Sequence, residues 1–241
     1  MKYFTNFLDT SLLVLVNCKM VDSVNVNTST ILGNMRYRKI PDETIRRLPM
    51  YLRAVLVLIS ADKQNASSKQ LADLVGINHW QIRKDFSYFG DFGTPGVGYE
   101  LEKLKKHIKK ILKLDGMHRT ALVGVGNLGS AVLAYTGLKE YGFDIVAAFD
   151  SNPKKIGKKI GNITIENASK LTSLSKRNIH LAIIAVPGEA AQDTADALVK
   201  AGVKGVLNFS PLHISVPKKV KVISIDIAMD LARLPYYIPL N

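Results

Sequence analysis

The chain has 241 residues, 47% of them hydrophobic, and a formal net charge of +13 at pH 7. This length can bury one or two ordinary cores, and the excess of Lys and Arg favours a polyanionic partner. The single cysteine, Cys18, excludes an intrachain disulfide framework, a Cys-rich zinc site and a redox dithiol. No apolar run reaches the roughly 20 residues of a membrane span, so no membrane partner is expected.

Residues 1–35 are expected to form a poorly structured extension outside the fold. A short apolar run at residues 12–16 follows Lys2, but Asp9 interrupts the would-be apolar core of a signal peptide, and no clean small-residue cleavage site follows. A secretory signal is therefore not expected, and a cytoplasmic protein is predicted. Met35 is an alternative start of the chain.

A winged helix DNA-binding domain is predicted over residues 36–99. Its first helix starts after Pro41, where acidic residues follow, or near Leu48, because Pro49 sits early in the apolar pattern. A second helix is N-capped by one of two serines and ends at Gly76, and a third runs from about residue 79 to 89. Four glycines then break regular structure, which is typical of a hairpin or wing.

The third helix is predicted to read DNA in the major groove. Arg83 or Lys84 can donate to guanine O6 and N7, and Gln81 can serve adenine or a phosphate. Asp85 is expected to orient an arginine or to cap the helix. The predicted DNA-binding residues are Ser67, Ser68, Lys69, His79, Gln81, Arg83, Lys84, Ser87 and Tyr88. A plain helical hairpin on a basic surface is the alternative interpretation.

Residues 100–118 are predicted to form a basic amphipathic linker helix, residues 119–226 an α/β domain, and residues 227–241 a terminal helix. In the α/β region short apolar strands alternate with helices, one of them predicted at 128–141. This alternation is typical of a parallel, doubly wound sheet.

A dinucleotide site is predicted at the glycine-rich loop that follows the first of these strands. Gly124 permits a tight turn, Gly126 lets the backbone approach a pyrophosphate, and Gly129 lets helix pack on strand. Asp150, 21 residues after Gly129, is placed to accept hydrogen bonds from the adenosine ribose, which favours NAD(H) over NADP(H). The loop residues assigned to the cofactor are Gly124, Val125, Gly126, Asn127, Leu128 and Gly129, with Val186 and Pro187 from a later strand end. Asn208 to Pro211 could line the nicotinamide side or form an ordinary loop.

A catalytic function is not predicted. The α/β region has no attached substrate domain, and His213 is the only histidine placed to exchange a proton beside a nicotinamide. No metal-ligand spacing or nucleophile elbow is present in the sequence. Two alternatives stay open: a small NAD-dependent oxidoreductase using His213, and a transcription factor that senses another nucleotide, such as a CoA-type ligand.

The chain closely resembles the Rex family of redox-sensing transcriptional repressors from about Ile40 to the C-terminus. The motifs that carry this resemblance are SKQLA at 68–72, QIRKDFSYFG at 81–90, FG at 92–93, GVGY at 96–99, VGNLG at 125–129, FD at 149–150, AVP at 185–187 and VLNFSP at 206–211. Residues 1–35 match nothing in the family, and Thr94-Pro95 stand where the wing often has a basic residue.

The resemblance implies an N-terminal winged helix domain, a C-terminal Rossmann domain and a homodimer that exchanges its C-terminal helix, here residues 227–237. It implies a repressor of an inverted-repeat operator, with NADH releasing the DNA and NAD⁺ competing. It also implies that Tyr99 and Asp196 form a cofactor-dependent pair that links subunits or domains.

Overall fold

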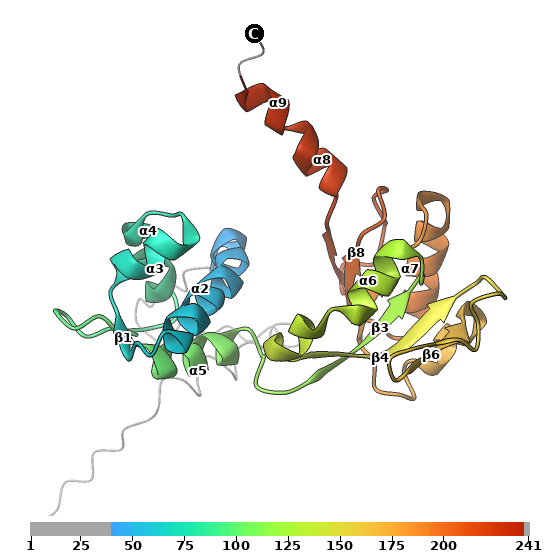
Figure 1. Cartoon of the computed structure of the whole chain (residues 1–241), viewed down its shortest axis with the longest axis horizontal. Coiled ribbons are helices and arrows are strands. Elements are labelled where there is room, and N and C mark those ends of the chain that lie inside the picture. Colours follow the sequence, from blue (N-terminus) through green and yellow to red (C-terminus); the bar gives the residue numbers. More distant parts are fainter. Residues whose placement is uncertain (1–39, 239–241) are drawn as a thin grey trace, which may run out of the picture. The chain divides into compact units, whose positions relative to one another are not determined.

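The structure is a computed structural model that describes residues 40–238 (Figure 1). The expectations about residues 1–35, including Cys18 and the alternative start at Met35, fall outside the described residues.

The N-terminal part of the described chain is a helical domain with a small sheet. Its helices are α2 (Asp42–Ser60), α3 (Ser68–Val75), α4 (His79–Ser87) and α5 (Leu101–Ile111), and β1 (Asn65–Ala66) pairs antiparallel with β2 (Tyr99–Glu100). Of the two predicted starts, α2 takes the earlier one and contains Pro49. Ser67 is the N-cap of α3 in a capping box with Gln70, and Gly76 ends α3 at φ +70°.

One apolar core holds this domain together. Its largest fully buried side chains come from all four helices: Leu48, Tyr51, Leu52, Leu71, Ile82, Leu101, Leu104 and Ile108. The apolar face of α5, predicted as a linker helix, is thus part of this core. The predicted wing is present, since a β-bridge joins Thr94 to Gly98 before β2 begins.

The C-terminal part is a seven-stranded sheet of order β5-β6-β4-β3-β7-β8-β9. Its strands are β3 (His118–Val123), β4 (Phe143–Asp150), β5 (Lys159–Ile160), β6 (Ile163–Asn167), β7 (Leu181–Ile184), β8 (Gly205–Asn208) and β9 (Lys221–Ser224). All neighbours are parallel except β5 and β6. The predicted parallel, doubly wound sheet is confirmed, with a short antiparallel edge strand that the sequence pattern did not predict.

Side chains alternate between the two faces of the sheet and form two apolar clusters, one that includes Phe149 and one that includes Leu122. The connecting helices are α6 (Asn127–Ala134), η1 (Thr136–Tyr141), η2 (Ala168–Ser173), η3 (Gly188–Ala190) and α7 (Ala191–Lys200). The helix predicted at 128–141 is divided because Tyr135 adopts an extended conformation, φ −77° and ψ 108°. The C-terminal segment forms α8 (Ile227–Ala232) and α9 (Leu234–Tyr237).

Candidate functional site

The turn after β3 requires glycine at two positions. Gly124 has φ +91°, and a Cβ atom there would lie 2.4 Å from the carbonyl oxygen of Ala185. A Cβ atom on Gly129 would lie 2.0 Å from the carbonyl oxygen of Gly124, so α6 approaches the strand this closely only with glycine. At Gly126, the N-cap of α6, a Cβ would meet nothing within 4 Å, so the backbone faces open space. The loop therefore offers an open helix N-terminus to an anion, as its sequence predicts.

Asp150 ends β4 and is tied directly to this loop. Its carboxylate accepts hydrogen bonds from the backbone N–H groups of Val125 (2.8 Å) and Asn152 (2.8 Å) and from Lys155 Nζ (3.1 Å). Burial alone would raise the pKa of Asp150, but these donors outweigh it and the pKa lies below its ordinary value. The carboxylate is therefore ionised at neutral pH and rigidly placed beside the glycine turn.

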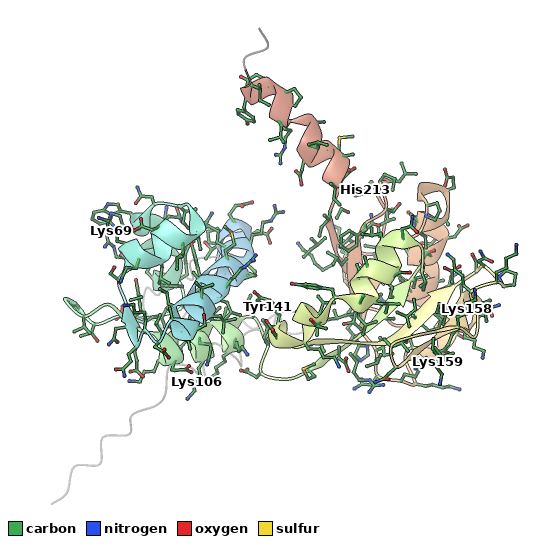
Figure 2. All side chains as sticks on the ribbon, in the orientation of Figure 1. Lys69, Lys106, Tyr141, Lys158, Lys159 and His213 are labelled. Carbon is green, nitrogen blue, oxygen red and sulfur yellow. The ribbon has the colours of Figure 1, made fainter. Side chains whose placement is uncertain are left out.

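A pocket of about 360 Å³ opens over this loop. Val125, Gly126, Asn127 and Ser130 line one side, and Lys155, Lys158, Lys159, Ile160 and Ile165 complete the lining. Figure 2 labels Lys158 and Lys159, which are exposed; Lys158 precedes β5 and Lys159 is the first residue of that strand. Loop amides and lysine ammonium groups are both donors to phosphate oxygens, so this wall fits an anionic ligand.

The pocket lies near the point where the strand order of the sheet reverses. β3 has β4 on one side and β7 on the other, and ligands of open α/β sheets bind at the strand ends beside such a point. The residues after β7 contact the glycine turn, because a Cβ on Gly124 would also lie 2.8 Å from Val186 Cγ1. Pro187 follows and is the N-cap of η3.

Asn208 organises the loop after β8. From the sequence, this loop could either line the nicotinamide side of a ligand site or be an ordinary connection. This side chain is fully buried, accepts a hydrogen bond from the N–H of Ser210 (3.0 Å) and donates to the carbonyl of Leu212 (3.0 Å). These bonds give Asn208 a structural role in shaping the loop.

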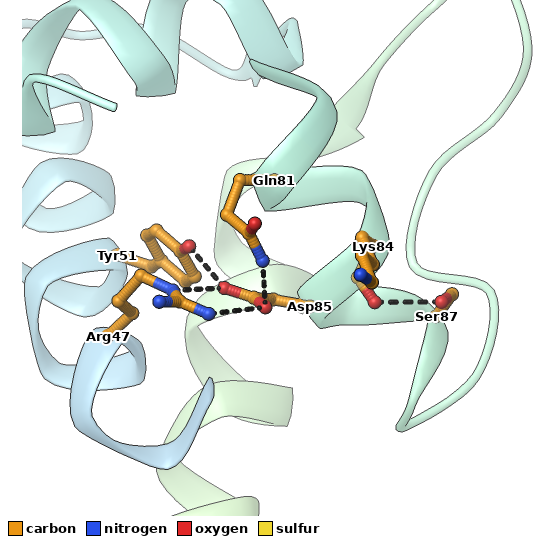
Figure 3. Close-up of polar contacts among 6 residues, drawn as sticks. All are labelled: Arg47, Tyr51, Gln81, Lys84, Asp85 and Ser87. Atoms are coloured by element: carbon orange, nitrogen blue, oxygen red, sulfur yellow. Dashed lines mark hydrogen bonds and ion pairs between the residues drawn. The ribbon is translucent and has the colours of Figure 1, made fainter. Parts of the chain in front are cut away.

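In the helix-turn-helix, a buried carboxylate fixes α4 to α2. Asp85 is 0% exposed and accepts two hydrogen bonds from the Arg47 guanidinium (2.6 and 3.0 Å), one from the Tyr51 hydroxyl (2.6 Å) and one from the Gln81 amide (2.7 Å) (Figure 3). The hydrogen bond to Asp85 holds the pKa of Arg47 above its usual value, and burial followed by the bond to Asp85 raises that of Tyr51. The expectation that Asp85 orients an arginine is confirmed, and the arginine is Arg47.

Arg83 is held by two contacts from the same domain. Its Nη1 donates to Ser68 Oγ (3.3 Å), and its guanidinium carbon lies 4.0 Å from the centroid of the Trp80 ring. A cavity of about 460 Å³ adjoins this arginine, lined by Ser67, Ser68, Ser87, Tyr99 and the glycine-rich wing among others. Helix α4 and the wing thus border one hollow surface.

The other predicted DNA-binding residues stand on or beside this helix-turn-helix. Lys69, Lys84 and Ser87 are exposed, and His79 and Tyr88 are half-buried. Ser87 Oγ donates to the carbonyl of Lys84 at 2.8 Å (Figure 3), and Figure 2 labels Lys69 on α3. Gln81 was expected to contact adenine or a phosphate, but here its side-chain amide donates a hydrogen bond to Asp85 Oδ1 at 2.7 Å.

Tyr99 and Asp196, the pair implied by the family resemblance, have separate local environments. Tyr99 is 7% exposed, packs edge-on against Phe86 with ring centroids 5.3 Å apart, and has its pKa raised by burial. Asp196 is exposed on α7 and accepts a hydrogen bond from Gln192 Nε2 at 2.9 Å.

Three further features bear on catalysis, metal binding and membrane insertion. His213 is exposed in the loop between β8 and β9 (Figure 2). Within residues 40–238, no group of His, Cys, Asp and Glu side chains is arranged to hold a metal ion. No helix of these residues is both long and apolar enough to cross a membrane.

Comparison with known proteins identifies relatives of both parts. The family model "Putative DNA-binding protein N-terminus" matches residues 39–87, and "CoA binding domain" matches residues 115–212. The redox-sensing transcriptional repressor Rex of Carboxydothermus hydrogenoformans is 46% identical over 205 residues, covering 85% of this chain and 99% of the relative. That of Chloroflexus aurantiacus is 44% identical over 199 residues, covering 82% and 94%.

The chain belongs to the Rex family of redox-sensing transcriptional repressors. Among solved structures, the Rex-family repressor RSP in complex with β-NAD⁺ and operator DNA matches with a TM-score of 0.78 and 35% identity, covering 83% of this chain and 93% of RSP. RSP in complex with β-NADH matches with a TM-score of 0.75 and 33% identity over 83% and 94% of the two chains. Family membership and these likenesses confirm the predicted two-domain fold.

The sequence pattern does not mark five residues that lie in or beside these sites: Arg47, Tyr51, Trp80, Lys158 and Lys159. Arg47 and Tyr51 were hidden because they lie in a helix whose pattern indicated only a core face. The spacing of Trp80 and Arg83, three residues apart on a helix, was the one local signal for their stacking.

Proposed function

We propose that this protein is a DNA-binding transcriptional repressor that senses the NADH/NAD⁺ ratio. The observation that carries the proposal is the geometry of the glycine turn and Asp150 in a chain that shares both domains with RSP, a protein held with NAD⁺ and operator DNA. In this function the chain acts in the cytoplasm, where it meets DNA.

The pocket over the glycine loop fits a dinucleotide. The backbone at Gly126 and Asn127 would donate to the pyrophosphate, and Lys158 would add charge there. Asp150, ionised and fixed, would accept hydrogen bonds from the adenosine ribose and repel a 2′-phosphate. Leu128, 39% exposed in the first turn of α6, and the Val186–Pro187 strand end would border the bound molecule.

The helix-turn-helix fits duplex DNA. Arg83 would donate to a guanine edge, and Lys84 and the exposed residues of α3 would contact the groove or the phosphates. The Asp85 network would hold α4 at one angle to α2, so that these side chains meet the groove in register. Because the wing carries Thr94 and Pro95, its contribution would come from backbone contacts.

A homodimer supports both parts of this function. The side chains of α8 and α9 are exposed, including Ile227 (66%), Met229 (67%) and Leu231 (62%). A second subunit would cover this apolar surface, which is consistent with the helix exchange that the family resemblance implies. Tyr99 and Asp196 would change partners when the cofactor changes, with NADH favouring the dimer that releases DNA and NAD⁺ competing for the same site.

The rival functions have less support. A small oxidoreductase would need a proton donor, and His213 is exposed in a loop without a described partner. The match to a CoA-binding family model describes the sheet, whereas the named relatives sense redox state. We therefore favour a regulator that is not an enzyme.

A gel-shift titration tests this proposal. Promoter DNA of the source genome should be retained by the protein with NAD⁺ and released as the NADH fraction rises. Turnover of NADH with aldehydes or ketones above background would favour the oxidoreductase, and release by CoA but not by NADH would favour the other sensor.

A further inference from the structure

Trp80 is an exposed aromatic side chain in the part of the helix-turn-helix that would enter DNA. It is the only tryptophan of the chain, and 66% of its surface is exposed. It occupies the second position of α4, where its backbone N–H donates to the side chain of the N-cap Asn78 at 2.9 Å. Among residues 40–112, Trp80 is the one aromatic residue among the large hydrophobic residues that are exposed. An exposed indole at this position has no role in the core.

The position and neighbours of Trp80 direct it toward a base. Helical side chains lean toward the helix N-terminus, and the first residues of a recognition helix are those that contact base edges. Arg83, one turn later, stacks on the indole with a guanidinium-to-centroid distance of 4.0 Å and is also bonded to Ser68. The guanidinium covers part of the indole and the His79 ring lies beside it, with ring centroids 5.3 Å apart. The 66% of the Trp80 surface that stays exposed is available to a ligand.

We propose that Trp80 is a specificity-determining residue that packs against the 5-methyl group of a thymine in the operator, beside the guanine bonded by Arg83. This inference rests on the proposed DNA-binding function and adds a base preference to it. In the major groove the 5-methyl group is the apolar feature that distinguishes thymine, and an apolar side chain is its natural partner. The stacked pair thus reads two bases at once, one by hydrogen bonds and one by apolar contact.

The test begins with a duplex that the wild-type protein selects from a random-sequence pool. Each thymine of one half-site is replaced in turn by deoxyuridine, which lacks only the 5-methyl group. Wild-type protein should lose affinity about fourfold at one position, which corresponds to the ~0.8 kcal/mol of one buried methylene-sized group. Trp80→Ala should bind the parent duplex more weakly and show no uracil penalty at that position. Trp80→Phe should keep part of the uracil penalty at that position.

Two measurements separate direct reading from an effect on Arg83. Replacing the guanine by 7-deazaguanine, which lacks the N7 acceptor, should weaken wild type and Trp80→Ala by similar factors. Fluorescence of Trp80 should change when the selected duplex is added. Val57→Ala, which trims another exposed apolar side chain of the same domain (47% exposed), serves as the matched control and should bind as wild type does.

The outcomes distinguish the inference from the function beneath it. If Trp80→Ala binds as tightly as wild type, or suffers the same uracil penalty, the assignment of Trp80 is overturned while DNA binding stands. If the pool yields no enriched sequence, the proposed DNA-reading function fails, and the role of Trp80 fails with it.

Discussion

Replacing Asp85 by alanine is expected to destabilise the helix-turn-helix by ~3 kcal/mol. The change leaves the fully buried Tyr51 and the Gln81 amide without their acceptor, and it removes the partner of the Arg47 charge. Breaking a buried ion pair by removing one partner typically costs ~3–5 kcal/mol. The Arg47 side chain is 23% exposed and can regain some hydration, which places the expected loss at the lower end of this range.

Hydrogen–deuterium exchange of the full-length protein measures this change locally. Peptides from α4 should lose protection in Asp85→Ala, while peptides from β3 and β7 serve as the internal reference. Tyr51→Phe should cost only ~1 kcal/mol, because it removes one hydrogen bond and leaves the ion pair intact. Replacing both charges, Arg47→Met with Asp85→Leu, should be milder than Asp85→Ala. A loss below ~1 kcal/mol in Asp85→Ala would refute this account of the network.

Further predictions concern the two sites. Asp150→Ala should weaken NADH binding by ~1–3 kcal/mol in isothermal titration, and a wild type that binds NADPH as tightly as NADH would contradict the role of this carboxylate. Because the pKa of Asp150 is lowered by folding, its stabilising contribution is complete above the unfolded value of ~3.9 and is lost as pH falls through the lower folded value. The stability gap between wild type and Asp150→Asn should therefore narrow on acidification, and urea unfolding at several pH values would show whether it does. Arg83→Ala should cost ~1–3 kcal/mol on a selected duplex and far less on random DNA; equal losses on both would reassign Arg83 to phosphates. Tyr99→Phe should bind NADH nearly normally but weaken its effect on DNA binding, as paired titrations would reveal.

Local rules explain why the glycine turn and Asp150 could be predicted from sequence. Gly124 and Gly129 are dictated by backbone geometry within one βα unit, and Asp150 follows at the end of the next strand. The capping residues Ser67 and Gly76 were predictable for the same reason, since caps depend on a few adjacent residues.

Long-range contacts were less accessible to sequence reasoning. Arg47 and Asp85 are 38 residues apart, and only the tertiary fold brings them within hydrogen-bonding distance. The apolar pattern predicted one helix at 128–141 and did not predict that the extended Tyr135 divides it. Lys158 and Lys159 are ordinary surface lysines in sequence, and their place in the pocket over the glycine loop depends on the short edge strand β5.

The affinity for NADH, measured with and without a saturating selected operator duplex, tests the central claim most directly. Because coupling between two ligands is reciprocal, NADH that releases DNA must itself bind more weakly when DNA is present. We predict a weakening of about 5- to 150-fold, the range that corresponds to ~1–3 kcal/mol of coupling. An NADH affinity that is the same with and without the duplex would contradict the redox switch, even if each ligand binds well by itself.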